Sequence, residues 1–175
     1  LDSGVVAAAI PGCEPARAAC LGHLALAEAL RGRLRHAAML AEQAATTCAG
    51  EGQRPPVRHA NPAALVALAW VHLEHHDLKQ TRSRLQQLNA VLEASPDKLI
   101  AAIACLIAAY SALAEGRDDM AVQSVARARS GWQVPAWLEH ELGLVESRAS
   151  VATGKIRAAF ADAEPASQHS SLKAT

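Results

Sequence analysis

The chain has 175 residues, enough for one domain with a sizeable core, and 51% of them are hydrophobic although only 3% are aromatic. The apolar residues are mostly Ala and Leu, which favour close-packed helices, so we predict an all-α fold in a single domain, 1–175. The 17 Lys and Arg residues balance 17 Asp and Glu residues. A duplex-binding domain carries a basic excess that neutralises phosphates, so we expect no direct nucleic acid contact.

The longest apolar segment, Leu99–Leu113, is too short to span a bilayer and is interrupted by Ser111. The apolar segment Val5–Ile10 lacks the basic start of a signal peptide. We therefore expect no membrane partner. The chain also has four cysteines without paired spacing, which indicates reduced, buried thiols in a cytoplasmic protein. They are Cys13, Cys20, Cys48 and Cys105.

Residues 14–49 are predicted to form a first pair of antiparallel helices that turns at Gly32. Apolar residues recur every three or four positions on both sides of this glycine, which places them on one face of each helix. They are Leu21, Leu24 and Ala25 before the turn and Leu34, Ala37, Ala38, Ala41 and Ala44 after it. Glycine directly after a helix is typical of a residue with left-handed backbone. The Gly and Pro residues of 50–56 then predict a loop.

Residues 61–94 are predicted to form the second pair. Asn61 is expected to cap its first helix, and Pro62 to occupy the first helical position, where no N–H is needed. His76 stands where the first pair has its turn glycine. We therefore expect His76 to make this turn at some strain, because it has a Cβ atom.

The third pair is predicted at residues 97–130, with its turn at Gly116. The sequence Ser95-Pro96-Asp97 is expected to start it as Asn61-Pro62 starts the second pair, with Asp97 favourable near the positive end of the helix dipole. Asp118 and Asp119 are expected to cap the second helix of this pair.

The fourth pair is predicted at residues 135–164, with Pro135 at its start and its turn at Gly154. Trp132 and Trp137 flank Pro135, and they either staple this loop or form an exposed contact patch. A polar tail follows at residues 165–175.

The last helix of this pair carries Phe160 and has no successor that would cover it. We expect its apolar face to bind a following repeat or a second copy of the chain, which would give a homo-oligomer. Because the chain also begins without Met, we expect it to be a fragment of a longer protein.

The four turn residues follow one another after 44, 40 and 38 residues. They are Gly32, His76, Gly116 and Gly154. Three of them are followed five residues later by an alanine, which allows two helices to approach closely: Ala37, Ala121 and Ala159. One helix pair cannot bury its apolar stripe, whereas stacked pairs bury a continuous core. The spacing therefore predicts a right-handed superhelix of about four antiparallel helix pairs, a tetratricopeptide-like α-solenoid with a long period.

Two stretches carry a more specific resemblance, Gly22–Leu34 (GHLALAEALRGRL) and Asn61–Leu78 (NPAALVALAWVHLEHHDL). Both resemble the helical repeat region of large MalT-like transcriptional regulators of the LuxR family, over roughly residues 13–163. The resemblance implies a sensor domain between a nucleotide-binding switch and a C-terminal helix-turn-helix. This chain has no phosphate-binding loop and no recognisable recognition helix. Any ATP would therefore bind elsewhere in the full-length protein, and no cofactor is expected here.

Large side chains are scarce, so their positions are informative. The residues six positions before the turn residues are Leu26, Trp70, Tyr110 and Arg148. In the predicted superhelix they would form a row on the concave face, with Glu74 beside it. Aromatic side chains and an Arg that grips carboxylates suit a protein, a peptide or a small effector. The alternative is that Trp70 and Tyr110 fill the core between repeats.

We therefore expect an effector- or partner-binding sensor domain of a transcriptional regulator. The alternative is a generic tetratricopeptide scaffold for protein–protein interaction, without a small-molecule effector.

Neither catalysis nor metal binding is expected. His72 and His76 lie one helical turn apart, with His75 and Glu74 between them, but they lack the order of a zinc-protease motif. His72 is expected to face the partner helix, and His75 and His76 to be exposed at the turn. An enzyme would need inward-facing acid or His pairs, and only Glu74, Glu141 and Arg148 come close.

Overall fold

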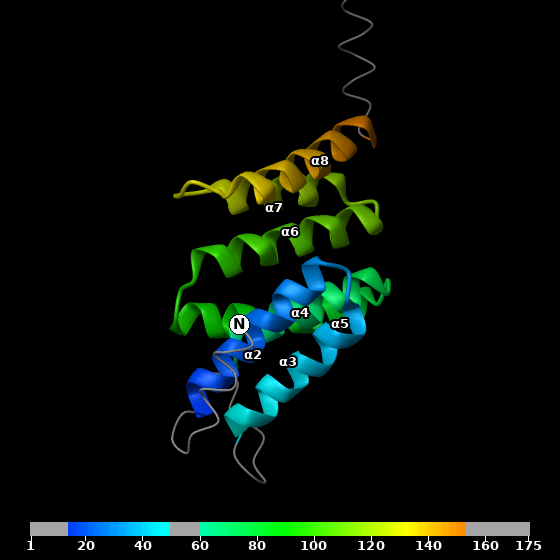
Figure 1. The fold of residues 1–175 in the computed structure, drawn as a ribbon. Coiled ribbons are helices and arrows are strands. Elements are labelled where there is room, and N and C mark those ends of the chain that lie inside the picture. Colours follow the sequence, from blue (N-terminus) through cyan, green and yellow to red (C-terminus); the bar gives the residue numbers. More distant parts are fainter. Residues whose placement is uncertain (1–13, 50–59, 153–175) are drawn as a thin grey trace, which may run out of the picture.

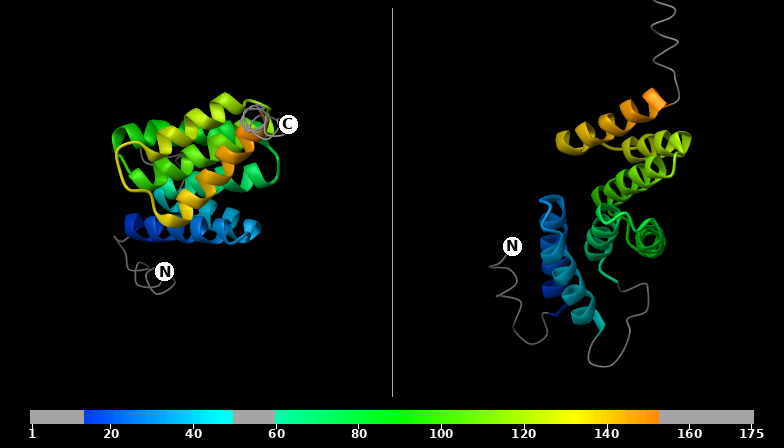
Figure 2. Two further views of the ribbon diagram at one scale, coloured as in Figure 1. Left: turned by 90° about the horizontal axis from the view of Figure 1, so that it is seen from above. Right: turned by 90° about the vertical axis from the view of Figure 1, so that its right-hand side faces the viewer.

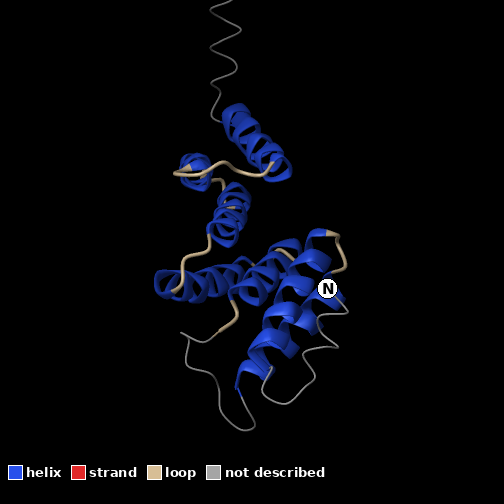
Figure 3. Ribbon diagram, turned by 60° about the vertical axis from the view of Figure 1, so that its left-hand side comes forward, coloured by secondary structure: helices blue, strands red, loops and turns tan. Residues whose placement is uncertain are grey.

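The computed structural model describes residues 14–49 and 60–152. These ranges contain only helices, turns and loops, which confirms the predicted all-α class for this part of the chain (Figure 3). The helices are α2 (Glu14–Leu30), α3 (Leu34–Ala49), α4 (Pro62–Glu74), α5 (Leu78–Ala94), α6 (Lys98–Ala114), α7 (Asp118–Arg129) and α8 (Ala136–Ala152) (Figure 1). None of them is long and apolar enough to cross a membrane.

Consecutive helices pack in pairs, α2 on α3, α4 on α5 and α6 on α7. The first helices of the pairs also contact one another, α2 with α4, α4 with α6 and α6 with α8. The pairs follow one another along the described part, with α2 and α3 at one end and α8 at the other (Figure 1 and Figure 2). The pair of α2 and α3 is inclined to α6, α7 and α8 (Figure 1).

Small residues make this close packing possible. Of the four α3 alanines predicted on the apolar face, three have no exposed surface, Ala37, Ala41 and Ala44, while Ala38 is partly buried. Ala121 on α7, at the same place after its turn as Ala37, is also fully buried. Larger side chains fill the centre farther along the chain. Leu88, Ile103, Leu106, Ile107, Leu138 and Leu142 are exposed by 1% or less.

The three described turns share one geometry. Gly32, His76 and Gly116 have positive φ values of 77°, 57° and 69°. In each turn the next residue's N–H bonds to a carbonyl five positions earlier, and the three N···O distances are 2.9, 2.9 and 2.8 Å. This bond is the signature of the Schellman motif. The prediction that His76 makes a glycine-type turn is confirmed. Its backbone is held in the left-handed region, which residues with a Cβ atom avoid.

Asn61 caps α4 as predicted and also ties α4 to α2. Its Oδ1 accepts a hydrogen bond from the N–H of Ala64 at 3.1 Å, and Pro62 is the first helical residue. Its Nδ2 donates to the carbonyl of Ala18 on α2 at 2.6 Å. The amide lies directly against Gly22, where a Cβ atom would come within 2.6 Å of Nδ2 and 2.7 Å of Cγ. Gly22 therefore leaves the space that Asn61 occupies.

Two of the predicted helix starts differ from the structure. Asp97, and not Ser95, caps α6, since its Oδ1 accepts from the N–H of Ile100 at 3.0 Å. Ser95 instead closes α5, because its N–H donates to the carbonyl of Val91 at 3.0 Å. Ser and Asp can both cap the start of a helix. Ser95 already forms the end of α5, so Asp97 caps α6.

The acidic pair after Gly116 does not cap α7. The N-cap position belongs to Arg117, which makes no side-chain capping bond. Asp118 and Asp119 lie inside the first turn of the helix. There they interact favourably with its dipole and do not bond its free N–H groups. The second pair places Asp77 directly after its turn residue, and Asp77 does cap α5 through the N–H of Gln80 at 3.0 Å.

Only one of the two tryptophans staples the loop before α8. Trp132 is half-buried against the core, and its Nε1 donates to the carbonyl of Ala128 at 3.1 Å. Trp137 has 44% of its surface exposed. Of the cysteines, Cys20 and Cys105 are free thiols and partly buried. The Cys13 and Cys48 side chains, Gly154, Ala159, Phe160 and the tail at 165–175 lie outside the described residues.

A buried carboxylate joins the end of α2 to the start of α3. Glu28 is only 4% exposed, and its Oε2 lies 3.2 Å from both Arg33 Nη1 and His36 Nδ1. The hydrogen bond with His36, helped by the Arg33 guanidinium, lowers the pKa of Glu28 below its ordinary 4.5, although burial acts in the opposite direction.

Candidate functional site: a groove between α4, α6 and α8

A cavity of about 640 Å³ opens where α4, α6 and α8 come together. We call it the α4–α6–α8 groove and define it by the ten residues that line it. They are Trp70, Leu73, Glu74 and His76 of α4 and its turn, Tyr110, Leu113 and Ala114 of α6, Asp118 of α7, and Glu141 and Arg148 of α8. Its volume lies within the range of small-molecule sites, about 300–1,000 Å³.

Four of the five predicted site residues meet in this groove. Trp70, Glu74, Tyr110 and Arg148 all line it. The fifth, Leu26, does not join them: it is 7% exposed and belongs to the hydrophobic core. Leu26 is packed inside the core, so the row expected on the inner face begins at Trp70.

Helix register brings these side chains together. Trp70 and Glu74 lie one turn apart on α4, and Glu141 and Arg148 lie two turns apart on α8, so each helix presents two of them on one face. Because α4 contacts α6 and α6 contacts α8, the three faces border one open hollow.

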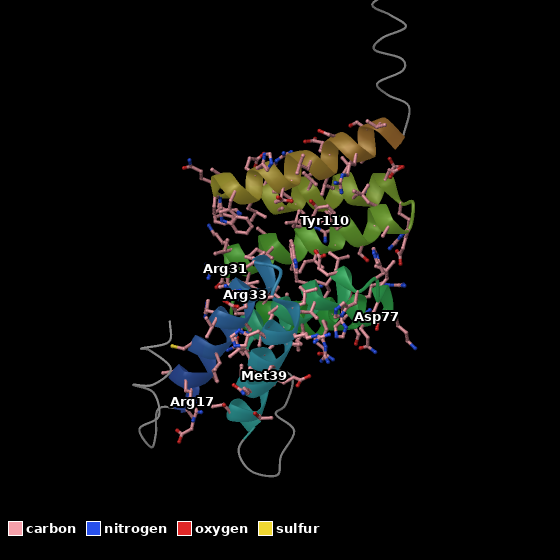
Figure 4. The ribbon with its side chains drawn as sticks, turned by 45° about the vertical axis from the view of Figure 1, so that its right-hand side comes forward. Arg17, Arg31, Arg33, Met39, Asp77 and Tyr110 are labelled. Carbon is pink, nitrogen blue, oxygen red and sulfur yellow. The ribbon has the colours of Figure 1, made fainter. Side chains whose placement is uncertain are left out.

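Tyr110 links two walls of the groove. Its phenol O–H donates to Glu141 Oε2 at 2.8 Å, which connects α6 to α8. Tyr110 is labelled in Figure 4, where α6 is drawn in green. Burial, followed by this hydrogen bond to a carboxylate, raises the pKa of Tyr110 from 10.0 to about 12. The phenol therefore stays protonated at neutral pH and acts as a fixed donor.

The groove carries more negative than positive charge. Glu74, Asp118 and Glu141 supply three carboxylates, against the single guanidinium of Arg148. Within residues 14–49 and 60–152, no ion pair involves Glu74, Asp118 or Arg148.

The histidines beside the groove form no metal centre in the described ranges, where no cluster of three or more His, Cys, Asp or Glu side chains could hold an ion. His72 is partly buried, and this burial lowers its pKa, while His75 and His76 are exposed. These positions agree with those expected from the sequence.

Three titratable residues of the lining were not predicted as groove residues. Glu141 was named only as a weak catalytic candidate, Asp118 was expected to cap a helix, and His76 to be a turn residue. Their place in the groove depends on how α4, α6, α7 and α8 pack, and the spacing of residues along the chain does not predict this packing. One signal in the sequence could have pointed to Asp118 as a groove residue, namely its position two residues after the turn residue Gly116.

A second hollow of about 540 Å³ lies between α5, α6 and α7. Its walls include Leu85, Leu92, Ala104 and Cys105. Burial raises the pKa of the Cys105 thiol, which disfavours the reactive thiolate. The sequence predicted a reduced, buried thiol, and Cys105 is a free thiol that is partly buried.

Comparisons with protein-family models, curated proteins and solved structures find no match to the chain.

Proposed function

We propose that the chain is a sensor or interaction domain of a cytoplasmic LuxR-family transcriptional regulator, which binds an effector or a protein partner in the α4–α6–α8 groove. In this proposal the helix pairs belong to a right-handed, tetratricopeptide-like superhelix. Nucleotide binding and DNA contact are assigned to other parts of such a regulator, and catalysis is not part of the proposal.

One observation carries the binding role. Trp70, Tyr110 and Arg148 each lie six positions before a predicted turn residue, and all three line one cavity. Aromatic and charged side chains gathered in a concave site are typical of ligand recognition. Core filling alone does not account for Arg148, which is exposed.

Binding would act as a population shift. A ligand that contacts α4, α6 and α8 together favours the arrangement in which these helices are closest. Such a shift would change the surface that the stack offers to neighbouring domains.

The test is a thermal-shift screen of metabolites and peptides on the full chain. A ligand at 100 times its Kd is expected to stabilise the fold by about 2.7 kcal/mol. Trp70→Ala is expected to weaken binding of any hit at least tenfold, whereas Trp137→Ala, the same change at an exposed site outside the groove, leaves it unchanged.

Circular dichroism of each variant separates lost binding from lost folding. If Trp70→Ala does not fold, Arg148→Ala is the second variant, because Arg148 is exposed. Hits that bind wild type and folded groove variants equally would refute the proposal. Stabilisation by peptides alone would favour the scaffold alternative, for which the exposed Trp137, Leu144 and Val151 on α8 offer a protein-binding face.

A further inference from the structure

The lining of the α4–α6–α8 groove combines aromatic rings with an excess of negative charge. Trp70 and Tyr110 provide two aromatic surfaces on neighbouring helices, α4 and α6. Around them stand the three carboxylates of Glu74, Asp118 and Glu141. The sequence suggested that Arg148 would grip a carboxylate, but such a ligand would meet three negative charges for each positive one.

We propose that the groove binds a small organic cation, an alkylammonium compound, between Trp70 and Tyr110 and opposite the carboxylates of Glu74 and Glu141. The inference rests on the proposed binding role of the groove and adds the chemical class of its ligand.

Aromatic faces attract cations because the ring face is electron-rich, and this attraction grows when the site excludes water. Both Trp70 and Tyr110 are partly buried, so part of each ring is withdrawn from solvent while part remains accessible. Two aromatic side chains on adjacent helices that line one cavity are the kind of residues with which proteins recognise quaternary ammonium groups.

The carboxylates reinforce this preference. Glu74 and Asp118 are not engaged in ion pairs with other described residues, so their charges are available to a ligand. Glu141 accepts the Tyr110 O–H and holds the phenol in place, while its other oxygen, Oε1, takes no part in that bond. A cation in the cavity would therefore be attracted by the aromatic rings and by the carboxylates, and the carboxylates would repel an anion.

Arg148 has a different role in this arrangement. Its positive charge opposes a cation and lowers the net negative charge of the groove. Replacing it with Gln should therefore strengthen cation binding, whereas the same change would weaken a carboxylate ligand. This difference in sign separates the two ligand classes.

The experiment uses three probes of nearly the same shape and different charge: choline, its neutral carbon analogue 3,3-dimethylbutan-1-ol, and the anion 3,3-dimethylbutanoate. The full chain contains three tryptophans, which give three indole N–H signals in a nitrogen–proton NMR spectrum. Trp70→Phe assigns the Trp70 signal, and each probe is titrated while that signal is followed.

Choline is expected to shift the Trp70 signal in a saturable way, with at least about fivefold higher affinity than the alcohol and still less binding of the anion. Glu74→Gln should weaken choline about two- to fivefold, and Arg148→Gln should strengthen it by a similar factor. Glu42→Gln, at an exposed site on α3, is the matched control and should change nothing.

The inference is overturned if the alcohol or the anion binds as tightly as choline, if Arg148→Gln weakens choline, or if choline leaves the Trp70 signal unmoved. If the alcohol or the anion binds as tightly as choline and saturates the Trp70 signal, the groove remains a binding site, but for another ligand class. The proposed function itself fails only if the wider screen yields no ligand whose binding is weakened by a folded groove variant, Trp70→Ala or Arg148→Ala.

Discussion

The contact between Gly22 and Asn61 predicts a substitution whose effect changes sign with its background. Gly22 lies inside α2, where Ala is favoured over Gly by about 0.8–1 kcal/mol. A methyl group at this position would overlap the Asn61 amide, so that amide would have to move. It would then lose its capping bond to Ala64 and its bond to the carbonyl of Ala18.

These losses set the expected magnitudes. The cap contributes about 1 kcal/mol, and the second hydrogen bond about 1 kcal/mol more. Gly22→Ala should therefore lower the free energy of unfolding by about 1 kcal/mol, because the gain in helix propensity offsets half of the loss. Asn61→Ala alone should cost about 2 kcal/mol. In the Asn61→Ala background, Gly22→Ala should stabilise the protein by about 1 kcal/mol, since nothing remains to be displaced.

Urea denaturation of the four proteins, followed by helical circular dichroism, measures this cycle. The expected coupling between the two positions is about 2 kcal/mol. Stabilisation by Gly22→Ala in the wild-type background would show that the amide is not held against α2, and the reasoning would fail.

Three further predictions concern single positions. His76→Gly should raise the free energy of unfolding by about 1 kcal/mol in urea denaturation, since φ is 57° there. Gly116→Ala, at φ 69°, should lower it by a similar amount, and effects of the same sign for the two changes would contradict this. Glu28→Gln should destabilise the protein above about pH 4.5. Because folding lowers the pKa of Glu28, this difference should shrink below pH 4.5 and vanish once the pH is below the lowered pKa of the folded state; a difference that persists in stronger acid would rule out the charge as its cause. Leu106→Ala, at a position with no exposed surface, should cost about 2–5 kcal/mol, whereas Leu99→Ala, 38% exposed, should cost far less; similar losses would place Leu99 in the core.

Local signals in the sequence predicted much of the local structure. The turns at Gly32, His76 and Gly116 depend on one residue that follows a helix, and the cap of α4 on the adjacent pair Asn61-Pro62. Such features are decided within a few residues, so a pattern along the chain captures them. The start of α6 was misassigned because Ser95 and Asp97 are both good caps, and the end of α5 decides between them.

The groove was only partly predictable because it depends on how the pairs stack. Counting back from the turn residues selected Trp70, Tyr110 and Arg148, which do line one cavity. The same count selected Leu26, which lies in the hydrophobic core. A rule that treats every pair alike cannot anticipate that the first pair is inclined to later ones (Figure 1).

The bond between Tyr110 and Glu141 gives the molecule a built-in optical reporter. The chain contains a single tyrosine, so the ultraviolet absorbance of tyrosinate comes from this one position. Burial, together with the hydrogen bond to Glu141 on α8, raises the pKa of this phenol from 10.0 to about 12. An alkaline absorbance titration therefore reports on the contact between α6 and α8 without any added label. A ligand that separates these helices would lower the pKa of Tyr110, and one that clamps them together would raise it.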